Sequence, residues 1–208
     1  MPPFLQSDLD DLSPTGRRWA LEAVTAGLHS TVVKHDQWKV AVKAYLACTT
    51  FVDAQIARLL DALDTGRYGS NTVIVLWSDH GWHLGEKQHW GKWTGWERST
   101  RVPLVIVPPK ERAATYKHLG QTCDEPISVI DIYPTLTDLC QVPAPELLDG
   151  QSLVPLLRDP ALRTDRTILT SFDPGNVALR SSRWRYIHYA DGTEELYDVV
   201  SDPNEWTN

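Results

Sequence analysis

Thr72-Val-Ile-Val-Leu-Trp77 is a run of apolar residues after its first threonine. Ser78-Asp-His-Gly81 follows it at once. A β-branched run without polar alternation is typical of a strand covered on both faces. A second such run, from Val102 to Val107, ends at two prolines and predicts another strand. We therefore expect two buried strands of one sheet, with polar residues at the carboxyl end of the first.

The segment before the first strand predicts a long amphipathic helix. From Asp36 to Asp64, apolar residues recur at steps of three and four, with Asp36 as the expected N-cap and Gly66 as the stop. The apolar positions are Trp38, Val42, Tyr45, Val52, Ile56, Leu59 and Leu63. A helix followed by two buried strands indicates an α/β fold.

After the second strand, the sequence predicts a short helix and then several short strands. Asp131 can cap a short helix that has Pro134 in its first turn, and we expect its inward positions to be Leu136, Leu139 and Cys140. Four short alternating segments follow, at 167–172, 177–180, 184–189 and 195–199. Because Asp191-Gly192 suits a tight turn, these segments predict a small antiparallel sheet.

These patterns divide the 208 residues into three parts. Residues 1–14, rich in proline and aspartate, predict either an arm ordered by docking or a cut linker. Residues 15–160 carry the α/β pattern, and residues 161–208 carry the small antiparallel subdomain. The chain is therefore expected to hold one main domain with an appendage.

Composition limits the partners. A net charge of −7 offers no broad basic surface for a phosphate backbone, so we expect no nucleic acid partner. No apolar run approaches the roughly 18–20 residues that span a bilayer, and the start lacks the features of a signal peptide. We expect a soluble chain without a membrane partner, and its compartment stays open. Cys48, Cys123 and Cys140 share no metal-type spacing.

Five of the nine tryptophans lie between residues 77 and 96, around the chemically richest segment. Packing explains such a cluster, and so does the wall of a pocket. Asp79, directly after the strand, can direct a carboxylate at a hard cation, although an aspartate here is also a common turn or cap residue. His80, His83 and His89 leave a zinc site with Asp79 open as an alternative, at irregular spacing.

Lys92 is the candidate for an anionic ligand. Its ammonium can pair with a sulfate or phosphate oxygen as a point charge. The tryptophans at 90, 93 and 96 would exclude water and strengthen that interaction. Taken alone, Lys92 would be interpreted as an ordinary surface lysine.

Several motifs resemble the type I sulfatases, and within them the iduronate-2-sulfatase-like branch. They are Val75-Leu-Trp-Ser-Asp-His-Gly-Trp-His-Leu-Gly-Glu-Lys87, His89-Trp-Gly-Lys92, Thr100-Arg-Val-Pro-Leu-Val105, Asp131-Ile-Tyr-Pro-Thr-Leu136, Leu148-Asp-Gly-Gln-Ser-Leu153 and Glu195-Leu-Tyr-Asp198. The resemblance covers nearly the whole chain. It implies the C-terminal part of an alkaline-phosphatase-like sandwich, followed by a small antiparallel β subdomain.

The resemblance also implies the roles of particular residues. Asp79 and His80 would complete a calcium site, with His80 the less certain ligand because calcium prefers oxygen. Lys92 would bind the sulfate group, and we expect Trp82, His83 and His89 on the substrate side as well. The partner implied is a sulfate ester, and a sulfated sugar is one partner of this kind.

One departure from the family limits the expected activity. Sulfatases make a formylglycine nucleophile from a Cys/Ser-x-Pro-x-Arg motif, and no such motif occurs in these 208 residues. We therefore expect a sulfuric ester hydrolase fragment that is inactive alone, binds calcium weakly, and needs a complementing N-terminal half or associates with itself. The alternatives are a noncatalytic module that binds sulfated glycans, and a zinc-dependent hydrolase.

Overall fold

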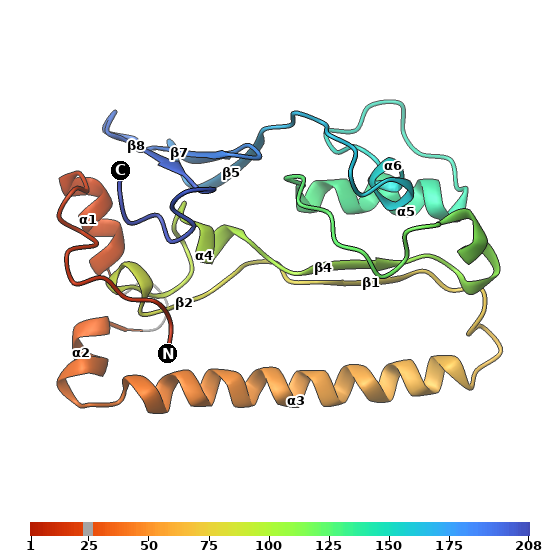
Figure 1. Ribbon diagram of the computed structural model, residues 1–208, viewed down its shortest axis with the longest axis horizontal. Helices are drawn as coiled ribbons and strands as arrows, with labels where there is room; N and C mark the ends of the chain where they lie inside the picture. Colours follow the sequence, from red (N-terminus) through yellow and green to blue (C-terminus); the bar gives the residue numbers. More distant parts are fainter. Residues whose placement is uncertain (23–26) are drawn as a thin grey trace. The chain divides into compact units, whose positions relative to one another are not determined.

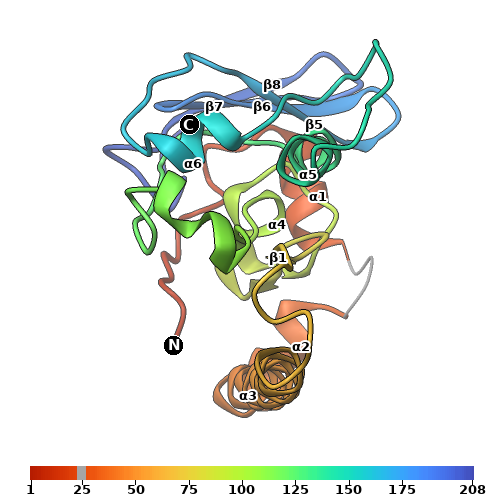
Figure 2. The same ribbon diagram turned by 90° about the vertical axis from the view of Figure 1, so that its right-hand side faces the viewer.

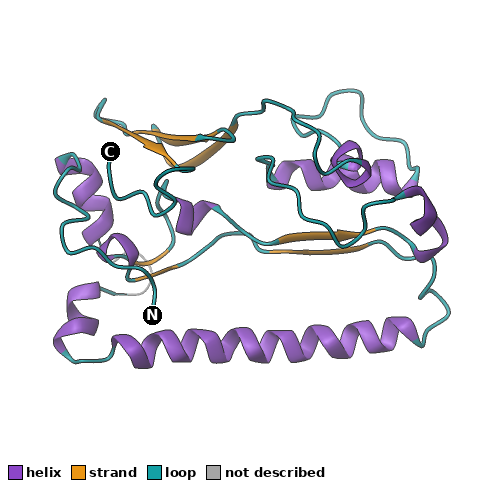
Figure 3. Cartoon of the chain, in the orientation of Figure 1, coloured by secondary structure: helices purple, strands orange, loops and turns teal. Residues whose placement is uncertain are grey.

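The structure is a computed structural model that describes residues 1–22 and 27–208 (Figure 1). The helices are α1 (Pro14–Leu21), α2 (His29–Lys34), α3 (Trp38–Asp64), α4 (Glu97–Thr100), α5 (Ile132–Cys140) and α6 (Val154–Arg158), with short 3-10 turns η1 (Glu86–Gln88), η2 (Lys110–Thr115) and η3 (Val129–Asp131). The strands are β1 (Ile74–Trp77), β2 (His83–Leu84), β3 (Trp90–Gly91), β4 (Leu104–Val107), β5 (Ile168–Asp173), β6 (Asn176–Arg180), β7 (Trp184–His188) and β8 (Glu194–Asp198). Helices and strands are both present along the chain, as Figure 3 shows by colour.

The chain forms two compact units that interleave along the sequence. Unit 1 comprises Met1–Asp53, Asp79–Val102 and Leu169–Asn208, and unit 2 comprises Ala54–Ser78 and Pro103–Ile168. The division into 1–14, 15–160 and 161–208 is consecutive instead, and stays a prediction.

Unit 1 contains the small antiparallel sheet, which confirms the sequence-based prediction. Its strands follow the order β5-β6-β7-β8, with β6 antiparallel to β7 and β7 antiparallel to β8 (Figures 1 and 2). The turn between β7 and β8 is the expected hairpin, closed by the amide of Tyr189 donating to the carbonyl of Thr193 at 2.9 Å. Gly192 supplies the positive φ, 83°, that this turn requires.

Residues of the N-terminal segment pack into the core of unit 1. Leu9 is 2% exposed and belongs to the same core cluster as Trp19, Trp96 and Ile187. The carboxylate of Asp8 is also buried. The choice between an arm and a cut linker for residues 1–14 stays a prediction.

Unit 2 contains β1 and β4, which pair antiparallel with Ile74 opposite Val107 and Trp77 opposite Leu104. Both predicted strands therefore exist. The expected burial on both faces is wrong, since Leu76 is 40% and Trp77 is 44% exposed. The reason is that the sheet has two strands within the described residues, so its width leaves side chains uncovered.

The predicted long helix is present as α3, the longest helix in Figure 3. Asp36 is not its N-cap, because Asp36 has a φ of 52° and lies two residues before the helix begins. The apolar stripe is only partly covered: Val42 is buried, whereas Val52 and Leu59 are exposed.

Among the residues that the structure describes, α3 is the one helix long and apolar enough to cross a membrane by length and composition. Its apolar stretch is interrupted by Lys43 and Asp53, so it is not an unbroken apolar run of the length considered in the sequence analysis. Length and composition alone do not assign α3 to a bilayer.

The predicted helix after Asp131 is α5, with Pro134 in its first turn. Asp131 precedes its first residue, but the carboxylate does not cap α5. It accepts from the amides of Ser128 and Gln151 and forms a bidentate pair with Arg166. Leu139 is buried and Leu136 is half-buried, as expected, and the inward position predicted for Cys140 is wrong because Cys140 is exposed.

Candidate functional site

Asp79 and His80 follow β1 after one residue, Ser78, and begin a part of unit 1. The Asp79 side chain is 72% exposed, and its Oδ2 lies 3.6 Å from Nε2 of His80. The other ring nitrogen of His80, Nδ1, lies 2.8 Å from the carbonyl oxygen of Gly81. The two predicted metal ligands thus face each other at the surface.

Gly81 holds this pair against the segment at α4. Its amide donates to the carbonyl of Ser99 at 2.8 Å. A Cβ at position 81 would clash with the backbone carbonyl of Arg98, so the close approach of the two backbones requires glycine here.

Trp82 extends this surface with an aromatic ring. It is half-buried and stacks on Tyr45 of α3, with ring centroids 6.4 Å apart. The His80 ring lies on another side of Trp82, at 6.1 Å. The Trp82 ring therefore lies beside the predicted metal ligand His80 and beside Tyr45. The contact of Trp82 with a substrate stays a prediction.

A short hairpin, β2 paired with β3, carries the remaining predicted residues. His83 lies opposite Gly91, and Leu84 lies opposite Trp90. The indole of Trp38 donates to the carbonyl of Leu84 at 2.7 Å. The hairpin is thereby attached to the start of α3.

Lys92 follows β3 and is half-buried. In the described part of the chain, its ammonium has no hydrogen-bond or ion-pair partner within the structure. Its carbonyl oxygen lies 3.0 Å from Nε2 of His89. The backbone of Lys92 is held while its charge stays available to an anion.

His83 and His89 are both fully buried, at 0% and 1% exposed. Nδ1 of His83 donates to the carbonyl of Glu86 at 3.1 Å, and its Nε2 lies 3.2 Å from the hydroxyl of Thr94. Burial, with the nearby His89 adding to it, holds the pKa of His83 well below its usual range. His83 is therefore neutral, and the Thr94 hydroxyl donates to it.

His89 has both nitrogens on carbonyl oxygens, Ala20 at 2.9 Å and Lys92 at 3.0 Å. Because both rings already use their nitrogens inside unit 1, a direct contact with substrate would require one of these bonds to break. Substrate contact by His83 and His89 stays a prediction.

Lys87 is a residue that the sequence did not single out. It is 2% exposed, and its ammonium donates to Oδ1 of Asp8 at 2.7 Å and to the carbonyl of Glu205. Nothing local in the sequence separates Lys87 from Lys92, because the partners of Lys87 lie 79 and 118 positions away.

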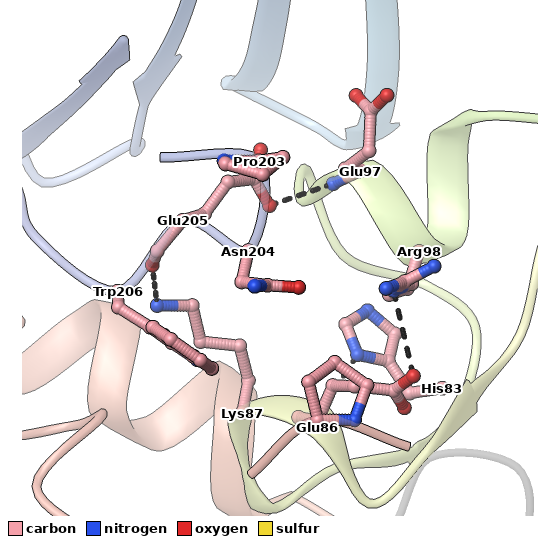
Figure 4. A pocket seen from close by; sticks show the side chains of 10 residues that line it. His83, Glu86, Lys87, Glu97, Arg98, Pro203, Asn204, Glu205 and Trp206 are labelled. Carbon is pink, nitrogen blue, oxygen red and sulfur yellow. Dashed lines mark hydrogen bonds and ion pairs between the residues drawn. The ribbon is translucent and has the colours of Figure 1, made fainter. Parts of the chain in front are cut away.

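A pocket lies beside this buried lysine, lined by residues of the hairpin, of α4 and of the C-terminal segment (Figure 4). In the close-up, Lys87 points towards Glu205, and the Glu97 amide donates to the Glu205 carboxylate at 2.9 Å. Arg98 pairs with Glu86 at 3.4 Å on another side. Charged groups beside the hairpin thus have partners among one another.

The donor set fits part of a calcium site. Asp79 offers exposed carboxylate oxygens, and calcium takes six to eight oxygen ligands in general. No group of three or more His, Cys, Asp or Glu side chains comes together for a metal among residues 1–22 and 27–208. Asp79 and His80 are therefore at most a partial set of ligands, and the choice between calcium and zinc stays a prediction.

The antiparallel C-terminal sheet, together with the Asp79-His80 pair and the lysine-bearing hairpin, defines the C-terminal part of an alkaline-phosphatase-like α/β fold. Two family models match the sequence: "Sulfatase" at residues 13–142, and "N-sulphoglucosamine sulphohydrolase, C-terminal" at residues 85–208. The chain belongs to the sulfatase family.

Individual relatives agree with this assignment. A sulfatase of Formosa agariphila is 38% identical over 207 residues, which are 100% of this chain and 39% of that protein. A 2-O GAG sulfatase has a similar structure, with a TM-score of 0.80, 22% identity, and coverage of 100% of this chain and 47% of that one. A third protein, solved with its substrate D-glucosamine-2-N,6-O-disulfate, has a TM-score of 0.67 and 25% identity over 92% of this chain and 39% of its own. The chain thus spans less than half the length of these relatives, and the expected fold class is confirmed.

Proposed function

We propose that this chain supplies the metal-binding and sulfate-binding part of a sulfatase site, within a protein that hydrolyses sulfuric esters. The observation that carries the proposal is Lys92: among residues 1–22 and 27–208 its ammonium has no hydrogen-bond or ion-pair partner, while its carbonyl lies 3.0 Å from Nε2 of His89. An unpaired cation on an ordered hairpin is suited to an anionic group. Asp79 and His80 belong to the same unit.

Calcium is the metal that we propose for Asp79 and His80. When bound, it would neutralise charge on the oxygens of the sulfate group. Asp79 would supply oxygen, and His80 would coordinate or orient the neighbouring carboxylate across 3.6 Å. Because two residues fill only part of the coordination shell, we expect weak binding by this chain alone.

The substrate class that we propose is a sulfated sugar. A sugar ring can stack on Trp82, which lies beside His80, while Lys92 meets the sulfate. The relative solved with D-glucosamine-2-N,6-O-disulfate supports this class of substrate. The motifs from Val75 to Lys92 favour the iduronate-2-sulfatase-like branch within the family.

The nucleophile is the part that this chain does not contain. No Cys/Ser-x-Pro-x-Arg motif occurs in the sequence, so we propose that hydrolysis needs a formylglycine from a segment outside these residues. The chain alone is then a binder of sulfate esters and not a catalyst.

Binding of D-glucosamine-2-N,6-O-disulfate to the purified chain, followed by NMR titration with calcium present, tests the proposal. We expect Lys92→Ala to weaken binding by roughly tenfold or more, because a hydrogen bond to a charged group contributes about 1.5–3 kcal/mol. Lys117→Ala is the matched control, since it removes the same charge from an exposed position in unit 2. Equal affinities of the Lys92 and Lys117 variants would exclude Lys92 as the sulfate ligand.

Hydrolysis separates the binder from the catalyst. With calcium and an aryl sulfate, we expect no turnover by this chain. Turnover that disappears in Lys92→Ala would show that the chain supplies its own nucleophile, and would overturn that part of the proposal.

A further inference from the structure

The His89 ring joins two backbone segments that are far apart in sequence. Nδ1 faces the carbonyl oxygen of Ala20 at 2.9 Å, and Nε2 faces that of Lys92 at 3.0 Å. The ring is 1% exposed. It is therefore a buried connection between the end of α1 and the residue that carries the free ammonium.

Ala20 is a suitable anchor for this connection. It lies in the last turn of α1, where carbonyl groups have no partner within the helix. Ala20 is 1% exposed, and with its neighbour Trp19 it belongs to the core cluster of unit 1. The anchor is thus part of the most tightly packed region of the unit.

The backbone around Lys92 needs such an anchor. Gly91 has a φ of 114° and Trp93 a φ of 76°, so Lys92 lies between two residues in unusual conformations. For tryptophan, a positive φ is unfavourable and persists only where surrounding contacts hold it. The bond from His89 reaches the carbonyl between these two residues.

We propose that His89 is a positioning residue that acts through Lys92. In the tautomer that carries the proton on Nε2, the ring donates to the Lys92 carbonyl, and this bond keeps the ammonium at the place where sulfate binds. The inference rests on the proposed function and assigns His89 a role through the backbone of Lys92, in place of contact with the substrate. A fixed lysine loses less conformational freedom on binding, so affinity depends on the bond.

Two conservative variants separate the two nitrogens of the ring. In His89→Gln the amide nitrogen is at the distance of Nε2 along the side chain and can donate to Lys92, whereas in His89→Asn it is at the distance of Nδ1 and can donate to Ala20. We expect His89→Gln to bind D-glucosamine-2-N,6-O-disulfate within about threefold of the wild type. We expect His89→Asn and His89→Ala to bind roughly fivefold to tenfold more weakly, as the loss of one hydrogen bond implies.

A double-mutant cycle supplies a readout that a purely structural role would not produce. If His89 acts through Lys92, His89→Asn has no further effect in the Lys92→Ala background. His29→Ala is the matched control: His29 is also a buried histidine, but its Nδ1 accepts from the Trp90 indole at 2.9 Å, not from the Lys92 backbone. We expect His29→Ala to lower thermal stability and to leave the affinity of the folded protein within about twofold.

The possible outcomes separate this inference from the proposed function. If Lys92→Ala binds like the wild type, the proposed function fails. If Lys92→Ala weakens binding but His89→Gln and His89→Asn lose equally, through unfolding or weaker binding, the positioning role is overturned. Additive effects of His89→Asn and Lys92→Ala would overturn it as well.

Discussion

Glu205 is a fully buried carboxyl in unit 1, with charged groups on several sides. Its Oε1 lies 2.6 Å from Nε of Arg185, and its Oε2 accepts from the amide of Glu97. Burial raises the pKa of Glu205 to about 7, with Arg185 and the Glu97 amide opposing the rise. The negative charges of Glu97 and the positive charge of Lys87 are the other groups that act on it.

This raised pKa predicts how the stability of unit 1 depends on pH. The folded state holds a proton on Glu205 up to about pH 7, whereas the unfolded chain releases it near 4.5. The contribution of Glu205 to the free energy of unfolding is therefore fully present below pH 4.5. As the pH rises from 4.5 to 7, this contribution falls by at most about 3 kcal/mol. Glu205→Gln removes this dependence.

Other groups titrate in a nearby pH range. The measurement is therefore the difference in the free energy of unfolding between the wild type and Glu205→Gln. Neutral His83 destabilises the fold as pH falls below 6.5, which is the opposite direction. Burial alone would raise the pKa of Glu97, but the ion pair with Arg185 lowers it. The lowered pKa adds stability that is lost in acid. Chemical denaturation of wild type and Glu205→Gln from pH 4.5 to 7 isolates Glu205. A difference between them that does not change with pH would contradict a raised pKa.

At the level of single residues, the sequence indicated which side chains carry chemistry but not how each is held. Asp79 and Lys92 were recognisable because they lie in a dense polar segment after an apolar run. The burial of His89 depends on Ala20, 69 positions away, and that of Lys87 depends on Asp8. Contacts at such separations leave no periodic signal in the chain.

At the level of elements, a buried ion pair joins the N-terminal segment, through Asp8, to Lys87 in η1. Asp8 and Lys87 lie 2.7 Å apart with side chains 4% and 2% exposed. We expect Lys87→Met to lower the free energy of unfolding by about 3–5 kcal/mol, because it leaves the Asp8 carboxylate buried without its partner. Adding Asp8→Asn should restore part of that loss, since no unpaired charge remains.

Lys110 provides a control for the effect of burial. It pairs with Asp64 at the same 2.7 Å, but both side chains are more than half exposed, at 65% and 59%. Removing it as Lys110→Met should cost no more than about 1 kcal/mol. Denaturant titrations of both variants test this, and similar losses at the two sites would mean that burial does not govern the pair.

Sequence patterns predicted the C-terminal strands correctly and predicted the burial of β1 wrongly. The four C-terminal strands alternate and close around Asp191-Gly192, so local pattern was sufficient. The run that forms β1 is apolar throughout, and its pattern indicates coverage on both faces. Coverage depends on neighbouring strands, and β1 has one, β4, among the described residues.

At the level of the whole molecule, α3 is a long helix with little coverage, since Val42 is its one buried residue. Its exposed large apolar side chains are Val40, Tyr45, Leu46, Phe51, Val52, Leu59 and Leu60. Exposed apolar surface of this kind marks an interaction site in general. The same side chains give α3 its bilayer-like composition, although Lys43 and Asp53 lie within its apolar stretch.

We expect α3 to associate in water with a second copy of the chain, because buried charges such as Lys43 and Asp53 would be costly in a bilayer and are tolerated at a protein interface. The double variant Phe51→Lys with Leu59→Lys should be monomeric at concentrations where the wild type sediments as a larger species. Leu147→Lys is the control, since Leu147 is 92% exposed and lies outside α3. If the wild type is monomeric, or if Leu147→Lys dissociates it equally well, α3 is not the interface. If the protein instead floats with lipid vesicles in an α3-dependent manner, the exposed helix serves a membrane, and the cost of its two charges must be offset by snorkelling or pairing at the bilayer surface.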